Sequence, residues 1–367
     1  MGREAIPRTS IGDRPRPTPT RPLALLLPNS APSPLDIPPD RSNDAANWST
    51  FSGCTEDFGS LGTDSGRRQT LASLHRTLST SAADGQAHLR CSTHTKENQM
   101  STSVAKLETH RFFARATSTE VEYKTLVPGH IPAEQPLPLI LHLHGAMSSA
   151  ASLEMARTAY EAAWVAGYLP PAIVACASTP TQGGFYIDYP GGPLWESLVG
   201  HELPEHVGKR HRLASHRAAI GFSMGGYGAL KIALRRPSAY QAVAALCPTV
   251  FPAEDLVSVP ARNRPAVLDE LNQAMGSGGY EACSVYGILR SNLVALRAAD
   301  VGIFIDCGEV DEFGLYDGAR YLHRLLTELS VPHEFRPIPG AGHADAKAAE
   351  RQAAAIRFIG NALRVAP

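Results

Sequence analysis

Residues 218–230 read Ala-Ala-Ile-Gly-Phe-Ser-Met-Gly-Gly-Tyr-Gly-Ala-Leu. The apolar run before Gly221 predicts a buried strand, and the run after Gly228 predicts a helix. Between them stands Gly-x-Ser-x-Gly with Ser223 at its centre, the pattern of a sharp strand-to-helix turn that exposes a serine hydroxyl. A side chain at either flanking glycine would collide with the turn or with neighbouring strands. We therefore predict a nucleophile elbow here, in preference to a glycine-rich turn with an incidental serine.

Two backbone N–H groups are expected near Ser223 to bind developing negative charge. The helix after the serine directs the free N–H groups of its first turn at an anion, so Met224 is one donor. The second donor of such an oxyanion hole comes from the loop after an earlier strand. Residues 139–147 fit this requirement, because an apolar strand leads into small residues where Ala146 or Met147 would supply the N–H.

His144 and Gly145 stand at the end of that predicted strand, where we expect them to border the substrate. Gly145 would also let the backbone approach closely. A rival hypothesis makes His142 and His144 metal ligands, since residues i and i+2 of a strand share a face. No carboxylate or cysteine nearby completes such a ligand set, so we expect neither a metal nor another cofactor.

The acid and the base should follow Ser223 in the order Asp or Glu, then His. Asp311 is our prediction for the acid, because it lies past a strand predicted at 301–305 and past the turn at Gly308. Glu309 is the other candidate. Asp306 directly continues the strand, and we expect its carboxylate to accept backbone N–H bonds instead.

His343 is our prediction for the base. It lies in the glycine-containing loop 339–345, after a short strand predicted at 333–338, and can reach the serine from there. An imidazole accepts and returns a proton near neutral pH.

The remaining pattern predicts one α/β domain. From about residue 121, nearly continuous apolar runs alternate with helical patterns, as expected for parallel strands buried on both faces. The strands are expected at 139–143, 172–177, 218–220, 242–246 and 301–305, and the helices at 153–165, 194–207, 226–235, 319–329 and 346–363. We predict the α/β-hydrolase fold, a doubly wound, mostly parallel sheet with helices on both faces. Residues 252–290 interrupt this alternation of strand and helix patterns and are a candidate cap over the site.

Residues 1–100 differ in character from residues 101–367, which form the predicted catalytic domain. The first part is rich in Pro, Ser and Thr and lacks apolar periodicity, so we predict a disordered tail. Its apolar run at 23–27 is too short for a secretory signal, which favours a cytoplasmic location. Met100 is an alternative start of the natural chain.

Composition restricts the function further. The formal net charge of -1 gives no support for nucleic-acid binding. No apolar run approaches the roughly 18 residues of a membrane span. The six cysteines form no Cys-x-x-Cys pair, so buried free thiols are expected. No pattern predicts an oligomeric state.

Several of these segments resemble one family of esterases, which includes esterase D, S-formylglutathione hydrolase and the antigen 85 mycolyltransferases. The resemblance covers about residues 120–360 and is carried by Gly-Phe-Ser-Met-Gly-Gly-Tyr-Gly-Ala-Leu at 221–230, the predicted helix at 195–204, and the segments 306–313 and 339–343. It implies the triad of Ser223, Asp311 and His343.

The resemblance also implies that the loop 184–189 borders the active site, with Tyr186 and Asp188 near the substrate. One departure is the segment 344–346, Ala-Asp-Ala, where family members often carry a bulky residue after the histidine. The resemblance predicts a serine esterase that hydrolyses small carboxylic esters through an acyl-enzyme. The alternatives are a thioester hydrolase, an acyltransferase, or an inactive binding protein of the same fold.

We expect removal of residues 1–99 to change neither the activity nor the thermal midpoint, because a disordered tail contributes no packed contacts. Ester hydrolysis and calorimetry on residues 100–367 beside the full chain would measure this. A midpoint several degrees lower would place the domain boundary elsewhere.

Overall fold

The computed structural model describes Gly2 and residues 104–129, 131–132, 134–255, 257–263 and 282–365. The predictions for a tail at 1–100 and for the centre of a cap at 252–290 lie outside these residues. Within the described part, no helix is both long and apolar enough to cross a bilayer.

One sheet of eight strands organises the part of the chain that the structure describes, in the order β1-β2-β4-β3-β5-β6-β7-β8. β1, β2 and β4 pair antiparallel, and every other neighbouring pair is parallel. The predicted mostly parallel sheet is confirmed. The strands are β1 (Ala105–Ala114), β2 (Thr119–Pro128), β3 (Leu137–Leu143), β4 (Ile173–Ala177), β5 (Leu213–Phe222), β6 (Ala242–Leu246), β7 (Gly302–Gly308) and β8 (Glu334–Ile338).

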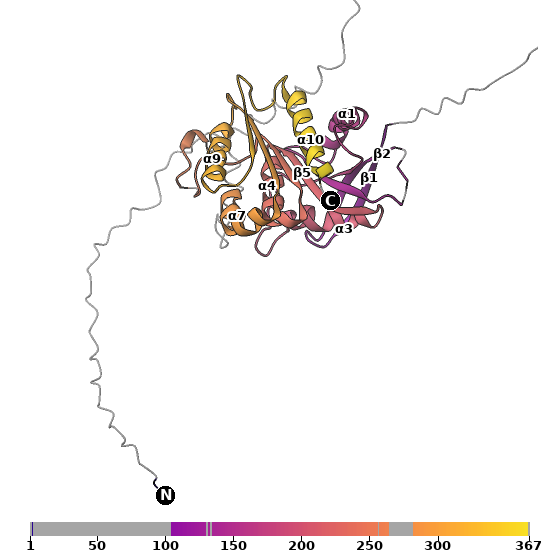
Figure 1. Cartoon of the computed structure of the whole chain (residues 1–367), viewed down its shortest axis with the longest axis horizontal. Helices are drawn as coiled ribbons and strands as arrows, with labels where there is room; N and C mark the ends of the chain where they lie inside the picture. Colours follow the sequence, from indigo (N-terminus) through magenta and orange to yellow (C-terminus); the bar gives the residue numbers. More distant parts are fainter. Residues whose placement is uncertain are drawn as a thin grey trace, which may run out of the picture. The chain divides into compact units, whose positions relative to one another are not determined.

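Helices cover both faces of this sheet (Figure 1). On one face, α1 (Ser152–Val165) and α10 (Ala348–Val365) pack over one apolar core. The other core lies under a larger group of helices. These are α2 (Trp195–Ser197), the π-helical segment η3 (Leu198–Glu202), α3 (Leu203–Gly208), α4 (Met224–Arg235), α7 (Val285–Ser291), α8 (Leu293–Ala299) and α9 (Leu315–Glu328). Two 3₁₀ turns, η4 (Pro237–Ala239) and η5 (Ala261–Asn263), complete the described elements.

The β1–β2 hairpin was not predicted from the sequence. β1 alternates apolar with charged or polar side chains such as Lys106 and Glu108, because it lies at the sheet edge. Its turn contains Ser118 in the left-handed region, at φ 54°. Because of its edge position, β1 lacks the continuous apolar run that marks the central strands.

A fully buried lysine ties α4 to the loop before α2. Lys231 Nζ lies 2.9 Å from Glu196 Oε2 and donates a hydrogen bond to the Tyr186 carbonyl at 3.0 Å. Glu196 is also buried and pairs with Arg235, whose side chain is 41% exposed. Helix α4, which begins at Met224, is thus fixed to the loop that the family resemblance implies borders the site.

Replacing Lys231 by Met should lower the free energy of unfolding by about 3 kcal/mol, because Lys231 is the fully buried partner of the Glu196 carboxylate and water cannot take its place. Arg235→Met is the matched control and should cost about 1 kcal/mol or less, since that cation is partly solvated. Chemical denaturation of both variants measures the difference. Equal stability losses would contradict the expected role of burial.

Candidate active site

Ser223 lies at the junction of β5 and α4 in a strained backbone conformation, at φ 57° and ψ −118°. Its N–H donates to the Leu246 carbonyl at 2.9 Å, and its carbonyl accepts from the Thr249 N–H at 3.1 Å. These bonds tie the turn to the end of β6. The strand, turn and helix therefore stand as predicted around the serine.

The flanking glycines allow this turn, as the sequence predicted. A Cβ at Gly221 would overlap the Gly225 carbonyl, and a Cβ at Gly225 would overlap the Leu143 carbonyl at the end of β3. A Cβ at Gly145 would lie 3.7 Å from that of Ser223. The loop after β3 consequently lies directly against the elbow.

That loop carries the two candidates for the second oxyanion donor. The Met147 N–H donates to the Thr181 hydroxyl at 2.7 Å. Among the described residues the Ala146 N–H has no acceptor, which favours Ala146 over Met147. Met224 is the first residue of α4, so its N–H lacks an intrahelical partner.

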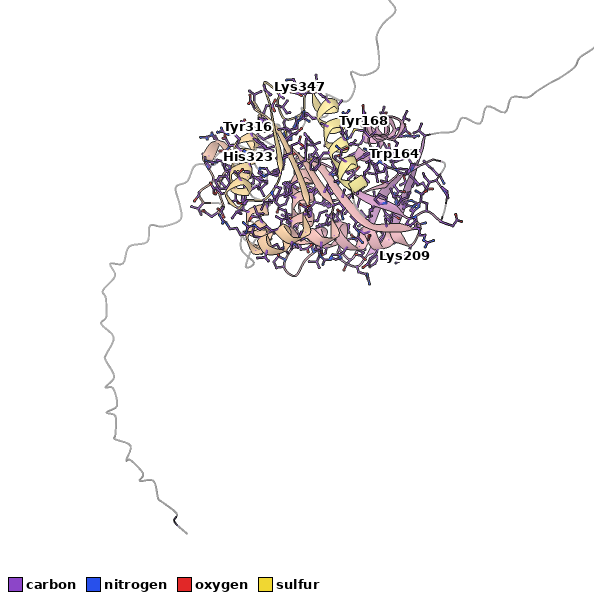
Figure 2. All side chains as sticks on the ribbon, in the orientation of Figure 1. Trp164, Tyr168, Lys209, Tyr316, His323 and Lys347 are labelled. Atoms are coloured by element: carbon purple, nitrogen blue, oxygen red, sulfur yellow. The ribbon has the colours of Figure 1, made fainter. Side chains whose placement is uncertain are left out.

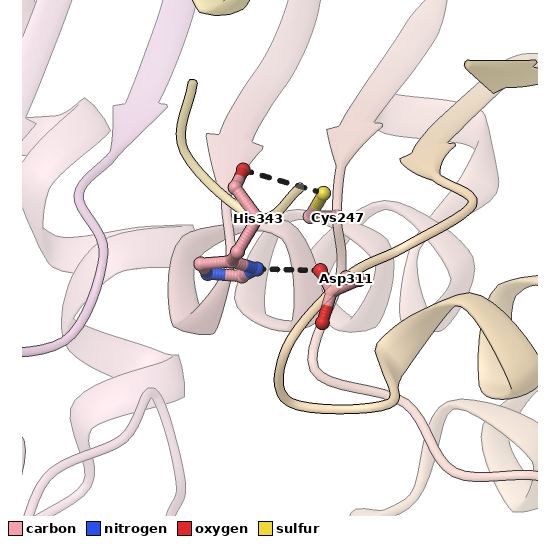
Figure 3. Close-up of side chains that lie close together, drawn as sticks. All are labelled: Cys247, Asp311 and His343. Atoms are coloured by element: carbon pink, nitrogen blue, oxygen red, sulfur yellow. Dashed lines mark hydrogen bonds and ion pairs between the residues drawn. The ribbon is translucent and has the colours of Figure 1, made fainter. Parts of the chain in front are cut away.

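The predicted acid and base lie in contact. His343 Nδ1 is 2.7 Å from Asp311 Oδ2, and the two side chains are 5% and 0% exposed (Figure 3). Asp311 Oδ1 accepts the N–H groups of Phe313 and Leu315 at 3.0 and 3.2 Å. Because these bonds hold one oxygen, the other faces the imidazole.

Two aromatic rings fix the plane of the histidine. The His343 ring centroid lies 4.8 Å from that of Phe222 and 4.8 Å from that of Phe313. Phe222 immediately precedes Ser223, so this packing places the imidazole beside the elbow. The backbone N–H of His343 also donates to Glu312 Oε2 at 2.8 Å, which anchors the loop after β8.

Opposing effects act on the pKa values of this pair. Burial lowers the pKa of His343, but the hydrogen bond to Asp311 and the nearby negative charge outweigh it and raise that pKa to about 9. Burial raises the pKa of Asp311, yet its hydrogen bond with His343 brings it below the ordinary value of 3.8. The pair therefore favours a carboxylate and an imidazolium.

The other two candidate acids make different contacts. Asp306 is fully buried and pairs with Arg351 of α10, with 2.7 Å between Oδ1 and Nη2. This ion pair was not predicted from the sequence, which assigned the carboxylate only to backbone N–H groups. Burial raises the pKa of Asp306 in spite of the guanidinium. Glu309 is exposed, 3.4 Å from the Tyr316 hydroxyl.

A pair of cysteines beneath the histidine was not identified as part of a site from the sequence. Cys247 and Cys307 are buried free thiols with their sulfurs 3.6 Å apart. Arg351 Nη2 lies 2.8 Å from Cys247 Sγ. The hydrogen bond from Cys307, with help from the guanidinium, lowers the pKa of Cys247 to about 6. Cys247 directly follows the apolar strand β6, and Cys307 lies near the end of the adjacent parallel strand β7, which was the available signal.

The remaining free thiols in the described part are Cys176, which is buried, and Cys283, which is partly buried. The expectation of buried free thiols thus holds for three cysteines, and Cys283 is free but only partly buried. Cys54 and Cys91 lie outside the described residues.

The residues predicted to border the substrate make hydrogen bonds within the fold. The His144 ring accepts from the Thr179 N–H at 2.9 Å and bonds the Gly145 carbonyl at 2.8 Å, so both ring nitrogens are occupied. Burial lowers the pKa of His144 to about 4. The Tyr186 hydroxyl is buried and donates to the His144 carbonyl at 3.1 Å.

Asp188 binds the first turn of α2 through the Ser197 N–H at 2.9 Å and the Ser197 hydroxyl at 2.6 Å. His142, of the rival metal hypothesis, is partly buried, with Nδ1 3.0 Å from the Tyr160 hydroxyl. All of these contacts are made within the protein itself. Contact between these residues and a substrate stays an untested prediction.

The order of the elbow after β5, the carboxylate after β7 and the histidine after β8 is that of an α/β hydrolase. The family described as "Putative esterase" matches residues 114–313, and the chain belongs to this family.

Curated relatives and solved structures agree with this class. The chain is 41% identical over 78 residues to S-formylglutathione hydrolase of Paracoccus denitrificans, covering 19% of this chain and 28% of the relative. It is 31% identical over 174 residues to the Bos taurus enzyme of the same name, covering 44% and 57%. The matches thus span at most about half of these relatives.

Among solved structures, a ferulic acid esterase superposes with a TM-score of 0.59 at 20% identity, covering 70% of this chain and 98% of the other. An S-formylglutathione hydrolase from Agrobacterium tumefaciens gives 0.58 at 19% identity, covering 71% and 96%. Similarity at this level of identity supports the fold.

Proposed function

We propose that the protein is a serine hydrolase that cleaves carboxylic esters of small molecules through an acyl-enzyme. One observation carries the proposal. A strained serine at a strand-to-helix turn shares the carboxyl edge of the sheet with a buried, hydrogen-bonded Asp311–His343 pair. Family membership of residues 114–313 supports the same chemistry.

In the proposed reaction, His343 takes the proton from Ser223 while the serine oxygen bonds to the acyl carbon. The N–H groups of Met224 and Ala146 bind the oxyanion. His343 then gives its proton to the leaving alcohol, and the acyl-enzyme forms. Water repeats the sequence and releases the acid. Throughout, Asp311 orients the imidazole and stabilises its charged form.

Hydrolysis of p-nitrophenyl acetate, propionate and butyrate tests this proposal. We expect turnover that a serine-reactive fluorophosphonate abolishes after labelling one site per chain. A protein that neither turns over these esters nor takes the label would be the inactive binding protein of the same fold.

Thioester hydrolysis is the second candidate, because the relatives matched in sequence are S-formylglutathione hydrolases. The same triad would act on either substrate. Comparing kcat/KM for S-formylglutathione with that for p-nitrophenyl acetate decides between them. Adding a short alcohol and measuring its ester detects acyl transfer, the third candidate.

The kcat/KM for ester hydrolysis should rise with pH, with a midpoint above 6.5. His343 must be neutral to accept the serine proton, and its raised pKa keeps it protonated to higher pH. Activity is therefore lost as the pH falls through that midpoint. The same shift stabilises the fold below about pH 6.5, and this stabilisation is lost as the pH rises through about 9.

A pH–rate profile of the wild type measures the midpoint, and Asp311→Asn provides the comparison. Removing the anion should move the midpoint of the residual activity to lower pH. A wild-type midpoint below 6.5, or the same midpoint in both proteins, would contradict this explanation.

A further inference from the structure

Several metal-binding atoms converge behind the imidazole. The Cys247 sulfur, a carboxylate oxygen of Asp311 and a ring nitrogen of His343 all lie within 4.8 Å of one another, and all three residues are buried (Figure 3). Cys307 Sγ adjoins two of them, at 3.6 Å from Cys247 Sγ and 3.9 Å from Asp311 Oδ2. We propose that this thiol–imidazole–carboxylate cluster binds a thiophilic divalent cation such as Zn²⁺, which inhibits the enzyme by occupying the acid–base pair. Only the inhibition rests on the proposed function.

The spacing of the donors suits a tetrahedral ion. With bonds of about 2.3 Å to sulfur and 2.0–2.1 Å to nitrogen or oxygen, a tetrahedron separates two sulfurs by about 3.8 Å and a sulfur from an oxygen by about 3.5 Å. The Cys247–Cys307 and Cys307–Asp311 separations of 3.6 and 3.9 Å are close to these values. The 2.7 Å contact between Asp311 and His343 would open by roughly half an ångström.

The charges around the cluster favour its metal-bound form. Two thiolates, one carboxylate and a neutral imidazole around a divalent cation sum to a single negative charge. Arg351 lies 2.8 Å from Cys247 Sγ and complements that charge, although it would repel a bare cation. The Asp306 carboxylate, 2.7 Å from the guanidinium, moderates that repulsion.

Contacts behind the donors hold the Asp311 carboxylate in place. Backbone N–H groups of Phe313 and Leu315 fix Asp311 Oδ1 and leave Oδ2 directed at the cluster. Such supporting contacts orient ligands in metal sites. The His343 side chain keeps 5% of its surface exposed and that of Asp311 none, so an ion enters past the imidazole. We therefore expect slow binding.

Cadmium is the probe, because its thiolate complexes absorb in the ultraviolet whether or not the protein is an esterase. The full chain carrying C54S, C91S and C283S retains three of its six cysteines, namely Cys176, Cys247 and Cys307. We expect this protein to bind one Cd²⁺ with a thiolate band, and Zn²⁺ to compete for the site. Adding C247S should weaken binding by at least about a hundredfold, since a ligand is lost.

Cys176→Ser is the matched control, because this thiol is equally buried but lies on β4, outside the cluster. It should leave the Cd²⁺ affinity unchanged. C307S should weaken binding as well, which guards against misfolding of C247S alone; near-ultraviolet circular dichroism checks both folds. Absence of a band, or a band that survives both C247S and C307S, would overturn the proposal.

A second pair of imidazoles has to be separated from the cluster in this test: His323 of α9, labelled in Figure 2, has Nδ1 2.8 Å from His333 Nε2. His333→Gln should therefore leave inhibition by Zn²⁺ intact, and a chelator should restore activity. Inhibition that disappears with His333→Gln and persists in C247S would overturn the proposal. A Cd²⁺ band in a protein without esterase activity would refute the proposed function and keep the metal site.

Discussion

Replacing Ser223 by alanine is expected to lower kcat for ester hydrolysis by about 10⁴–10⁶-fold, because the attacking oxygen is gone. The contacts that hold the turn are made by the Ser223 backbone, at 2.9 Å to the Leu246 carbonyl and 3.1 Å to the Thr249 N–H. Alanine keeps both. The thermal midpoint should therefore stay near that of the wild type while activity and fluorophosphonate labelling disappear.

Ser197→Ala is the matched control for this result. Its hydroxyl binds Asp188 at 2.6 Å in the loop beside the site, so the variant removes one serine oxygen without touching the elbow. It should retain labelling and most of the activity. The assignment of Ser223 as the nucleophile would be contradicted if folded Ser223→Ala protein kept more than a tenth of the wild-type kcat.

The strands and the elbow were predictable because their causes are local. A strand buried on both faces must be apolar along its whole length, as β6 is, and the turn at Ser223 needs glycines on both sides whatever surrounds it. The sequence positions of Asp311 and His343 followed from the order of the strands. The edge strand β1 escaped prediction because only part of its surface is buried.

Contacts between segments far apart in the chain could not be predicted from the sequence. No local pattern, for example, pairs His144 with the Thr179 N–H or Asp188 with the Ser197 N–H, as the fold does. Arg351 was not predicted as part of the site, because its position depends on how α10 packs over the sheet. Such partners are set by tertiary packing, which no local pattern encodes.

Asp311 and Asp306 illustrate the same point, because they are five residues apart and face different partners. Asp311 contacts the His343 imidazole at 2.7 Å, whereas Asp306 pairs with Arg351 at 2.7 Å. Both carboxylates are buried, but an imidazole that loses its anion can become neutral, whereas the Arg351 guanidinium stays charged. The two asparagine variants should therefore fail in different ways.

Asp311→Asn should cut kcat by roughly 10³–10⁴-fold while stability stays near wild type. Its amide oxygen can still accept the N–H groups that bind Oδ1, but its NH₂ group would face Nδ1 and favour the wrong imidazole tautomer. Asp306→Asn should instead lower the free energy of unfolding by about 3–5 kcal/mol, because it leaves the buried Arg351 charge without its anion.

Measuring kcat and the free energy of unfolding for both variants, at a temperature where each is folded, separates the two roles. Residual activity of folded Asp306→Asn should exceed that of Asp311→Asn by at least about a hundredfold, since only the latter disturbs the tautomer. If Asp306→Asn is the inactive but stable variant, the acid must be reassigned to Asp306. If both variants stay active and stable, the exposed Glu309 becomes the candidate, and Glu309→Gln is the variant that would then lose activity.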